Sequence, residues 1–261
     1  MSAGPGTRLD GRVAVISGAG RARGIGKATA RLLAENGARV VLLDVDAAEV
    51  QEAARDVAGA GGDARAIGLA CDIRDPAACR DAIERAAAWG GGTVHVLVNN
   101  AGLTQKRGVE DISADDYALV TDVVLRGTLN LSQAALPRMA QGGSIVCVSS
   151  MSAQQGGGVF GGAHYCAAKA GVLGLVRAMA RELGPRAIRV NAVAPGLVLT
   201  DFSRSGSTDE QKHATAAANG WPLRRAGSPA EIAGAILFLA SDLSTYVTGT
   251  TLDVNGGAHM R

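Results

Sequence analysis

The sequence contains few aromatic side chains and little net charge. Phenylalanine, tryptophan and tyrosine make up 3% of its 261 residues, and the formal net charge is +2. No basic cluster is interleaved with aromatics, so neither nucleic acid nor an anionic membrane is expected as a partner. No apolar run reaches the roughly 18 residues that a membrane span requires. The first ten residues also lack the apolar segment of a secretory signal, and these absences together predict a cytoplasmic protein.

Patterns for metal ligation and disulfide pairing are also missing. The four histidines are scattered along the chain. The four cysteines show neither metal-ligand spacing nor a disulfide framework. They are Cys71, Cys79, Cys147 and Cys166. No metal site is therefore expected.

What the sequence does contain is a regular alternation of strand-like and helix-like segments. No linker divides the chain, so residues 1–261 are expected to form one domain. The alternation implies crossover connections, and hence a doubly wound α/β (Rossmann) fold with a seven-stranded parallel sheet and helices on both faces. Strands are expected near 12–17, 39–43, 65–69, 94–98, 143–148, 187–193 and 250–254, and helices near 24–36, 46–58, 75–88, 113–139, 163–183 and 229–241. The irregular segment 200–228 is interpreted as a substrate loop.

A glycine-rich turn follows the first expected strand. Gly18 and the run Gly24-Ile25-Gly26 lead from that strand into a helical pattern. Glycines let the backbone approach a phosphate, and a helix N-terminus favours negative charge, so the turn predicts a pyrophosphate site. The second strand ends at Asp44. A carboxylate there can accept hydrogen bonds from both hydroxyls of an adenosine ribose, and it would repel a 2′-phosphate.

Tyr165 and Lys169 form a second notable pattern. Their spacing of four residues places both side chains on one face of an expected helix. A phenol beside an ammonium suits proton transfer near neutral pH, because a neighbouring cation lowers the pKa of the phenol. Ser150 lies upstream at a strand end, on the sheet edge where ligands of such folds bind.

Together with further motifs, these segments resemble the short-chain dehydrogenase/reductase family over essentially the whole chain. Residues 99–102 read Asn-Asn-Ala-Gly, which is the family's signature after a strand. Residues 71–73 resemble the segment that meets the adenine, and residues 191–200 resemble the segment around the nicotinamide. The tail from 246 to 257 is similar to the family's last strand. Members that reduce 3-oxoacyl carrier thioesters share every one of these motifs.

The resemblance implies an NAD(P)-dependent oxidoreductase that transfers a hydride between a nicotinamide and a secondary alcohol or ketone. Tyr165 would be the general acid in reduction and the base in oxidation. Lys169 would lower the pKa of Tyr165 and hold the nicotinamide ribose, and Ser150 would orient the substrate oxygen. The expected cofactor-binding residues are Gly18, Arg23, Gly24, Ile25, Gly26, Asp44, Asp72, Ile73, Asn99, Ala101, Gly102, Tyr165, Lys169, Pro195, Gly196, Val198 and Thr200.

Three departures from the family pattern are present. Two extra residues lie between Gly18 and Gly24, and we expect them to bulge outward with Arg21 or Arg23 near the adenosine or pyrophosphate. Val124 stands where the family has an asparagine that holds a water for proton supply to the lysine. We expect water to reach Lys169 instead through a backbone carbonyl at a local helix distortion. The separation of Ser150 and Tyr165 is two residues longer than usual, which glycine-rich residues 154–164 can absorb in a loop.

The preferred cofactor follows from opposing charges. Asp44 favours NAD by repelling the extra phosphate of NADP, whereas Arg23 resembles a feature of members that use NADP. The carboxylate acts at closer range than an arginine in an inserted loop, so NAD is expected, with NADP as the alternative.

The substrate is less well encoded. The expected lining residues are Gln154, Gln155, Phe160, His164 and Phe202. Their mixture of amides and apolar groups favours a small polyol, a sugar-derived ketone or a hydroxy acid. The alternative is a 3-oxoacyl thioester reduced with NADPH, for which Arg204, Lys212, Arg224 and Arg225 would form a basic patch or else a solvated face.

Two further expectations concern other classes of function and assembly. A nucleotide-binding regulator or scaffold with impaired catalysis is the alternative from another class, and Val124 is the feature in its favour. The helices expected at 113–139 and 163–183 carry small and apolar residues over much of their surface. The family pairs such helices, so a homotetramer or homodimer is expected.

Overall fold

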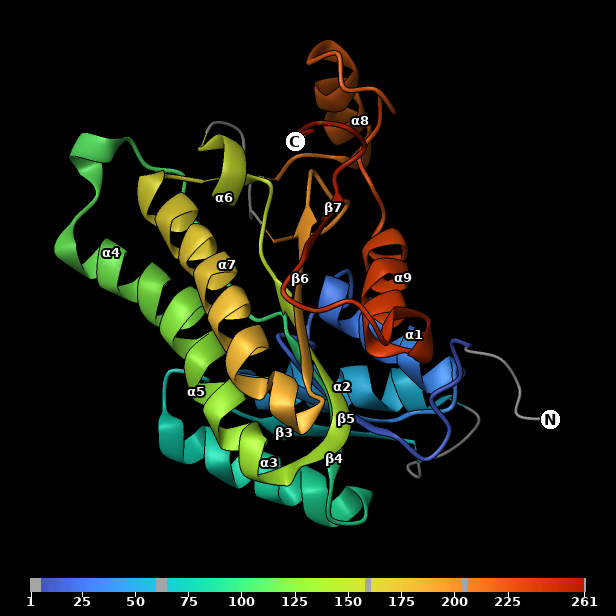
Figure 1. The fold of residues 1–261 in the computed structure, drawn as a ribbon. Coiled ribbons are helices and arrows are strands. Elements are labelled where there is room, and N and C mark those ends of the chain that lie inside the picture. Colours follow the sequence, from blue (N-terminus) through green and yellow to red (C-terminus); the bar gives the residue numbers. More distant parts are fainter. Residues whose placement is uncertain (1–5, 60–64, 158–160, 203–205, 261) are drawn as a thin grey trace.

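Seven parallel strands form the centre of the computed structural model, which describes residues 6–59, 65–157, 161–202 and 206–260 (Figure 1). The strand order is β3-β2-β1-β4-β5-β6-β7. The strands are β1 (Val13–Ser17), β2 (Arg39–Asp44), β3 (Ala66–Ala70), β4 (Val94–Asn99), β5 (Met139–Val148), β6 (Arg189–Pro195) and β7 (Thr251–Val254). The order changes direction between β1 and β4, and this switch point opens a crevice beyond the carboxyl ends of the strands. The predicted doubly wound fold is confirmed.

Helices cover both faces of the sheet, as continuous apolar strands require. Alternation along β1 divides the core, because Val15 packs into one cluster whereas Ala14 and Ile16 pack into the other. The Val15 side is covered by α3 (Pro76–Gly90), α4 (Ala114–Thr121), α5 (Gly127–Ala135) and α7 (Ala163–Leu183). The Ile16 side is covered by α1 (Ile25–Glu35), α2 (Ala47–Ala58) and α9 (Pro229–Ala240). Within the described ranges, no helix combines the length and apolarity needed to cross a bilayer.

Two predicted segments differ from the structure. The single helix expected at 113–139 is interrupted by a π-helical segment, η3 (Asp122–Arg126), and it gives way at Pro137 to the 3₁₀ turn η4 (Leu136–Arg138). Strand β5 then starts at Met139, four residues earlier than expected. Proline lacks the amide N–H that would continue the helix, which explains the early end.

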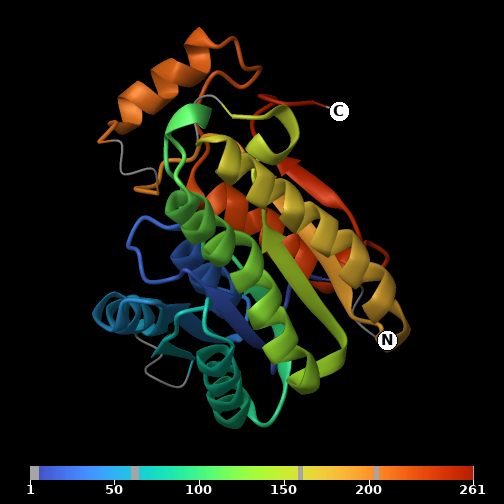
Figure 2. The ribbon, with the colours of Figure 1, turned by 90° about the vertical axis from the view of Figure 1, so that its left-hand side faces the viewer.

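The segment 200–228 was expected to be irregular, but it contains the helix α8 (Asp209–Ala218). The Thr208 hydroxyl accepts a hydrogen bond from the Gln211 N–H, and the Gln211 side chain accepts one from the Thr208 N–H. This capping box starts a helix that has no apolar face to reveal it. Figures 1 and 2 place α8 at the same end of the molecule as the short helix α6 (Ser152–Gln155), beyond the carboxyl ends of the strands.

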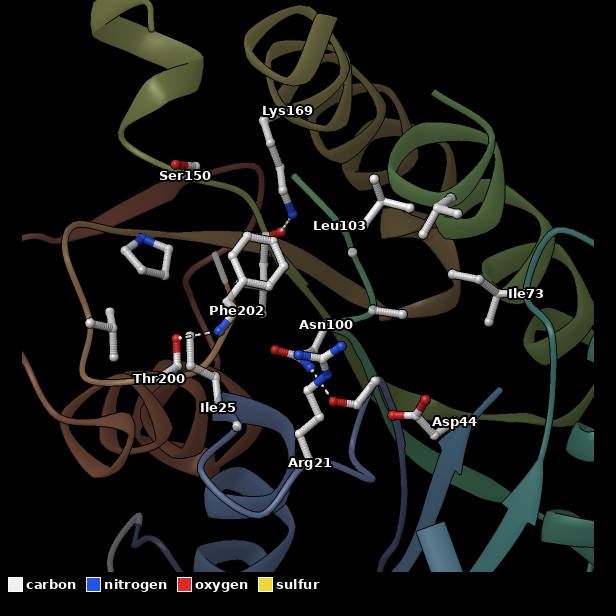
Figure 3. A pocket seen from close by; sticks show the side chains of 18 of the residues that line it. Arg21, Ile25, Asp44, Ile73, Asn100, Leu103, Ser150, Lys169, Thr200 and Phe202 are labelled. Atoms are coloured by element: carbon white, nitrogen blue, oxygen red, sulfur yellow. Dashed lines mark hydrogen bonds between the residues drawn. The ribbon is translucent and has the colours of Figure 1, made fainter. Parts of the chain in front are cut away.

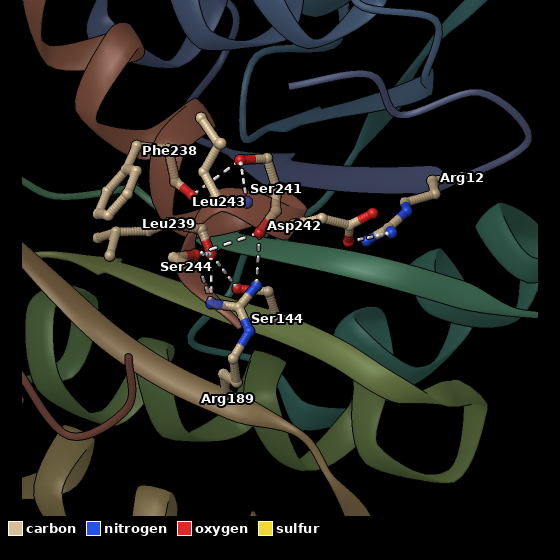
Figure 4. Close-up of polar contacts among 9 residues, drawn as sticks. All are labelled: Arg12, Ser144, Arg189, Phe238, Leu239, Ser241, Asp242, Leu243 and Ser244. Carbon is tan, nitrogen blue, oxygen red and sulfur yellow. Dashed lines mark hydrogen bonds and ion pairs between the residues drawn. The ribbon is translucent and has the colours of Figure 1, made fainter. Parts of the chain in front are cut away.

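At the amino end of β6, a buried arginine joins the sheet to the end of α9. The Arg189 guanidinium donates to the Leu239 carbonyl at 2.7 Å and to the Ser244 hydroxyl at 2.8 Å (Figure 4). It also donates to the Ser241 carbonyl at 3.2 Å. These bonds satisfy carbonyls that a helix C-terminus leaves without partners, and they hold α9 against the sheet.

Candidate active site

A cavity of about 430 Å³ lies at the carboxyl edge of the sheet, where the switch point places it (Figure 3). The loops after six strands line it, together with α7 and α8. Figure 3 shows Ser150 and Lys169 toward one side of this cavity and Arg21 and Asp44 toward the other. Among the predicted residues, those that line it are Gly18, Gly24, Ile25, Asp44, Asp72, Ile73, Ala101, Gly102, Ser150, Tyr165, Lys169, Pro195, Gly196, Val198, Thr200 and Phe202.

The glycine turn is a close-fitting cradle. Gly18 has a φ of +65°, and a Cβ there would lie 2.6 Å from the Cα of Ala101. A Cβ on Gly26 would collide with the Gly18 carbonyl oxygen. The side-chain amide of Asn100 donates to the carbonyls of Ser17 and Gly18, each at 2.9 Å, and so holds the turn. Bare backbone at the N-terminus of α1 is what a dinucleotide pyrophosphate requires, so these residues fit that group.

Asp44 is held by backbone groups at the end of β2. Its carboxylate accepts from the Gly20 N–H at 2.9 Å and from the Val45 N–H at 2.8 Å. Gly20 lies in the turn that carries the two extra residues, and a Cβ there would come within 3.1 Å of this carboxylate. The lengthened turn therefore bonds directly to the acidic residue instead of only bulging outward.

Tyr165 and Lys169 lie on α7 with only 4% and 3% of their surfaces exposed. The Lys169 ammonium donates to the Val148 carbonyl at 2.6 Å and lies 5.9 Å from the centroid of the Tyr165 ring. The Phe202 ring lies 6.3 Å from the Tyr165 ring, centroid to centroid. The Ser150 hydroxyl accepts from the Ser152 N–H at 3.1 Å, which fixes its position at the end of β5. The structure thus brings together the three predicted catalytic side chains.

Burial controls how these groups titrate. Burial raises the pKa of the Tyr165 phenol, and a hydrogen bond with Ser150 opposes the rise. Burial lowers the pKa of Lys169 to about 8. Lys169 is not among the causes of the Tyr165 shift, so the expectation that it lowers the pKa of Tyr165 stays a prediction. The ammonium bonds to Val148, and desolvation of the phenolate is the larger effect.

Three residues predicted to bind the cofactor do not line the cavity. Gly26 lies beneath the turn against Gly18. The Asn99 amide points into the core and donates to the Ser132 hydroxyl at 3.0 Å. Arg23 extends toward α8, where its guanidinium donates to both carboxylate oxygens of Asp209 at 2.6 Å.

Most of the predicted substrate residues also lie elsewhere. Gln154 donates to the Asp253 carboxylate at 3.0 Å, and Gln155 is exposed. His164 is buried with its Nε2 3.0 Å from the Gln105 side-chain oxygen, and it lines a separate shallow pocket beside α4. Phe160 falls outside the described residues, so Phe202 is the predicted substrate residue that the structure places at the cavity.

Six polar residues of the cavity were absent from the predicted catalytic, cofactor-binding and substrate residues. They are Arg21, Arg74, Asn100, Ser149, Asp201 and Lys212. Asn100 belongs to the recognised Asn-Asn-Ala-Gly signature, so its signal was present. Arg74 pairs at 2.6 Å with Asp72, two residues away, in the segment that was expected to meet the adenine. Lys212 was expected only in a basic patch or on a solvated face, because it belongs to a polar helix whose inward face only the tertiary structure defines.

The local helix distortion expected at Val124 is present as the π-helical segment η3. The Gly127 N–H bonds to the Asp122 carbonyl, five residues back, and the Val124 carbonyl accepts from the Thr128 hydroxyl at 2.7 Å. The Val124 side chain is 1% exposed within the core. Proton supply to Lys169 through this segment stays a prediction.

Comparison with known proteins agrees with this geometry. A family model described as enoyl-(acyl carrier protein) reductase matches residues 18–259. An uncharacterised short-chain dehydrogenase/reductase of Sinorhizobium fredii is 51% identical over 95% of this chain and 98% of its own. A 3-oxoacyl-(acyl-carrier-protein) reductase of Vibrio cholerae is 40% identical over 97% of this chain and 99% of its own. An L-rhamnose 1-dehydrogenase (NAD(P)⁺) of Azotobacter vinelandii is 39% identical over 94% of this chain and 96% of its own.

Solved structures show the same relationship. A dehydrogenase/reductase of Sinorhizobium meliloti superposes with a TM-score of 0.89, at 34% identity over 97% of both chains. A blue fluorescent protein from a metagenomic library, in complex with NADPH, superposes with a TM-score of 0.86, at 34% identity over 97% of this chain and 100% of that one. Sequence and fold thus agree over nearly the whole chain. This chain belongs to the short-chain dehydrogenase/reductase family, and it is an NAD(P)-dependent oxidoreductase of that family.

Proposed function

We propose that this protein is an NAD-preferring dehydrogenase that interconverts a small secondary alcohol and its ketone. The observation that carries the proposal is the placement of Ser150, Tyr165 and Lys169 in the same cavity as the glycine cradle. A nicotinamide bound there supplies or accepts the hydride. The proposed substrates are a small polyol, a sugar-derived ketone or a hydroxy acid.

The residues have distinct proposed roles in proton handling. The Tyr165 phenol, protonated at neutral pH because of its burial, donates its proton to the carbonyl oxygen during reduction and accepts one back during oxidation. The Ser150 hydroxyl holds the substrate oxygen beside that phenol, and Lys169 contacts the nicotinamide ribose. The raised pKa of Tyr165 favours reduction near neutral pH, and oxidation should accelerate as the pH rises.

The proposed preference for NAD rests on Asp44. Its carboxylate is held at the cavity by the N–H groups of Gly20 and Val45, and from there it would accept hydrogen bonds from the ribose hydroxyls. The neighbouring Val45 is 69% exposed and offers no cation for a 2′-phosphate. Arg23, which could have favoured NADP, is paired with Asp209 instead.

Substitution of Tyr165 and Asp44 tests these roles separately. Tyr165→Phe should lower turnover by about 10²–10⁴-fold while NADH binding stays close to that of the native protein. Asp44→Ala should keep turnover but relax the selectivity for NAD over NADP. Both are measured by absorbance of the reduced nicotinamide with polyols, hydroxy acids and secondary alcohols, and in reverse with ketones. Retained turnover in Tyr165→Phe, or unchanged selectivity in Asp44→Ala, would contradict the corresponding assignment.

A second candidate is reduction of a 3-oxoacyl thioester with NADPH, which the similarity to the Vibrio cholerae reductase favours. The suggested basic patch for a carrier protein gives it less support. Lys212 is buried, and Arg225 pairs with Glu231 at 2.6 Å, while Arg204 falls outside the described residues. Assay of a 3-oxoacyl thioester with NADPH beside the alcohol panel separates the two. NADH or NADPH binding without turnover of any substrate would favour the regulator or scaffold instead.

A further inference from the structure

Lys212 is a buried cation in the cavity that the proposed chemistry does not use. It follows the capping box at the start of α8, and 7% of its surface is exposed. Its ammonium donates to the Thr200 carbonyl at 2.6 Å and lines the same cavity as the glycine cradle. The helix that appears polar in sequence therefore directs one long cationic side chain inward.

Lys212 interacts with a carboxylate of the protein only at longer range: its charge is one of the smaller causes that lower the pKa of Asp209, three residues earlier. Across the described ranges, no carboxylate forms an ion pair with this ammonium, whereas the buried Lys27 pairs with Asp56 at 2.6 Å. An ammonium has three N–H donors, and a buried charge without a partner is unfavourable. A cavity that holds such a cation is suited to an anion from a ligand.

A second cation, Arg21 of the glycine turn, contacts the segment after β6 that Lys212 also contacts. Arg21, in the glycine turn, lines the cavity and donates to the Asp201 carbonyl at 3.3 Å. Arg21 and Lys212 therefore contact adjacent carbonyls, those of residues 201 and 200, from the glycine turn and from α8. Two cations that line one cavity and bond to adjacent carbonyls favour an anionic phosphate group over a neutral one.

A third contact fixes α8 relative to the glycine turn. Arg23 lies in the lengthened turn and pairs with Asp209 one helical turn before Lys212. This pair is largely exposed, so we assign it a positioning effect and not a large contribution to stability. The extra residues of the turn thereby connect the cradle to the helix that carries Lys212.

We propose that Lys212 is a ligand of the cofactor's pyrophosphate, and that α8 completes the dinucleotide site by carrying it. The proposal rests on the proposed function insofar as that function requires a dinucleotide in this cavity. Helix α8, which lies in the segment 200–228 expected to be a substrate loop, would then take part in binding the cofactor.

Equilibrium binding of cofactor fragments tests the proposal. We would titrate NADH, ADP-ribose and adenosine into the native protein, Lys212→Met, Lys212→Arg and the exposed control Lys106→Met by calorimetry. Lys212→Met should weaken the binding of NADH and of ADP-ribose by about tenfold, or about 1.4 kcal/mol. Its affinity for adenosine should stay unchanged, because adenosine lacks the pyrophosphate. Lys212→Arg should keep most of the affinity, and Lys106→Met all of it.

Other outcomes are equally informative. If Lys212→Met binds ADP-ribose as the native protein does but shows a raised KM for acidic substrates alone, the ammonium serves the substrate and the proposal is wrong. An equal loss of adenosine affinity would indicate a structural role and would also overturn it. Native protein that binds neither NADH nor ADP-ribose would overturn the proposed function as well, whereas normal turnover with an unaffected Lys212→Met variant would overturn this inference alone.

Thermal unfolding without ligand shows whether the Lys212→Met variant is folded. Removal of a buried, unpaired ammonium should leave the Tm of Lys212→Met at or above that of the native protein, while the rise in Tm on addition of NADH should be smaller. A ligand-free Tm well below the native value, with an unchanged response to NADH, would contradict the proposal.

Discussion

Tyr165 and Lys169 lie side by side on α7, and burial acts on them in opposite directions. It disfavours the phenolate and the ammonium alike, so the pKa of the tyrosine rises and that of the lysine falls. The spacing of the pair was evident from sequence, but the direction of these shifts was not. Desolvation depends on the atoms that surround a group, and those come from β5, the loop after β4 and Phe202.

Lys169 should make stability depend on pH. Its pKa is about 8 in the folded protein, against an ordinary value of 10.5. Between these values the unfolded chain binds a proton that the folded chain lacks, so stability from this group rises with pH across the window, by up to about 1.4 kcal/mol per pH unit. Urea unfolding at about pH 7.5 and about pH 9.5 should show a larger gain for the native protein than for Lys169→Met. Equal gains in the two proteins would show that the lysine titrates normally.

At the scale of elements, the helix between β4 and β5 is distorted where valine stands in place of the expected asparagine. Segment η3 is π-helical although residue 124 is valine. Its side chain packs in the core cluster with Val120 and Leu131 instead of holding water. The backbone distortion therefore does not need the asparagine side chain, and the Val124 carbonyl accepts a hydrogen bond from the Thr128 hydroxyl.

Val124→Asn should consequently destabilise the protein without improving turnover. An amide at a position that is 1% exposed would lose its water without gaining a designed partner, at a cost of about 1–3 kcal/mol. Urea unfolding measures the loss, and Arg126→Asn, an exposed change in the same segment, is the control. A strong gain in turnover at low pH would instead show that proton supply in the native protein is impaired.

Two helical glycines should respond oppositely to alanine. In Gly26→Ala the new methyl group would collide with the Gly18 carbonyl, so both stability and NADH affinity should fall. In Gly234→Ala, on α9, the methyl group meets no atom within 4 Å, and stability should rise by about 0.5–1 kcal/mol because alanine favours helix. Thermal unfolding and NADH titration of both variants check this, and a stable Gly26→Ala with native affinity would contradict the close packing of the cradle.

At the scale of the whole molecule, apolar surface remains exposed along α4 and the neighbouring face of α7. Val109 and Tyr117 are 78% and 52% exposed, and with Ile112, His164 and Ala167 they surround a shallow pocket. Tyr246 and Met260, near the C-terminal end, are exposed as well. Exposed apolar groups on paired helices are consistent with the predicted self-association, which stays a prediction.

Light scattering should therefore give a mass near two or four times that of the 26.3 kDa chain. Tyr117→Asp should lower that mass, because a charge placed in the apolar face opposes its burial against a second copy. Leu243→Asp, at an exposed position elsewhere, should not change it. A native protein with the mass of one chain would refute the prediction.

The sequence by itself determined the fold and singled out Ser150, Tyr165 and Lys169, which the structure places in one cavity. Apolar strands, helical periodicity, the glycine turn and the Tyr165–Lys169 spacing are local patterns, and each acts through neighbours in the chain. They led to the doubly wound sheet and to the family, both of which the structure and the comparisons confirm.

The tertiary structure decided which of several equivalent side chains faces the cavity. It selects Asn100 over Asn99 and Arg21 over Arg23, and it turns Lys212 inward. These outcomes depend on contacts between segments far apart in sequence, such as Arg23 with Asp209 and Arg21 with the Asp201 carbonyl. A local sequence pattern does not predict such contacts. The burial of a site and the pKa shifts of its residues arise only once these distant segments have packed together.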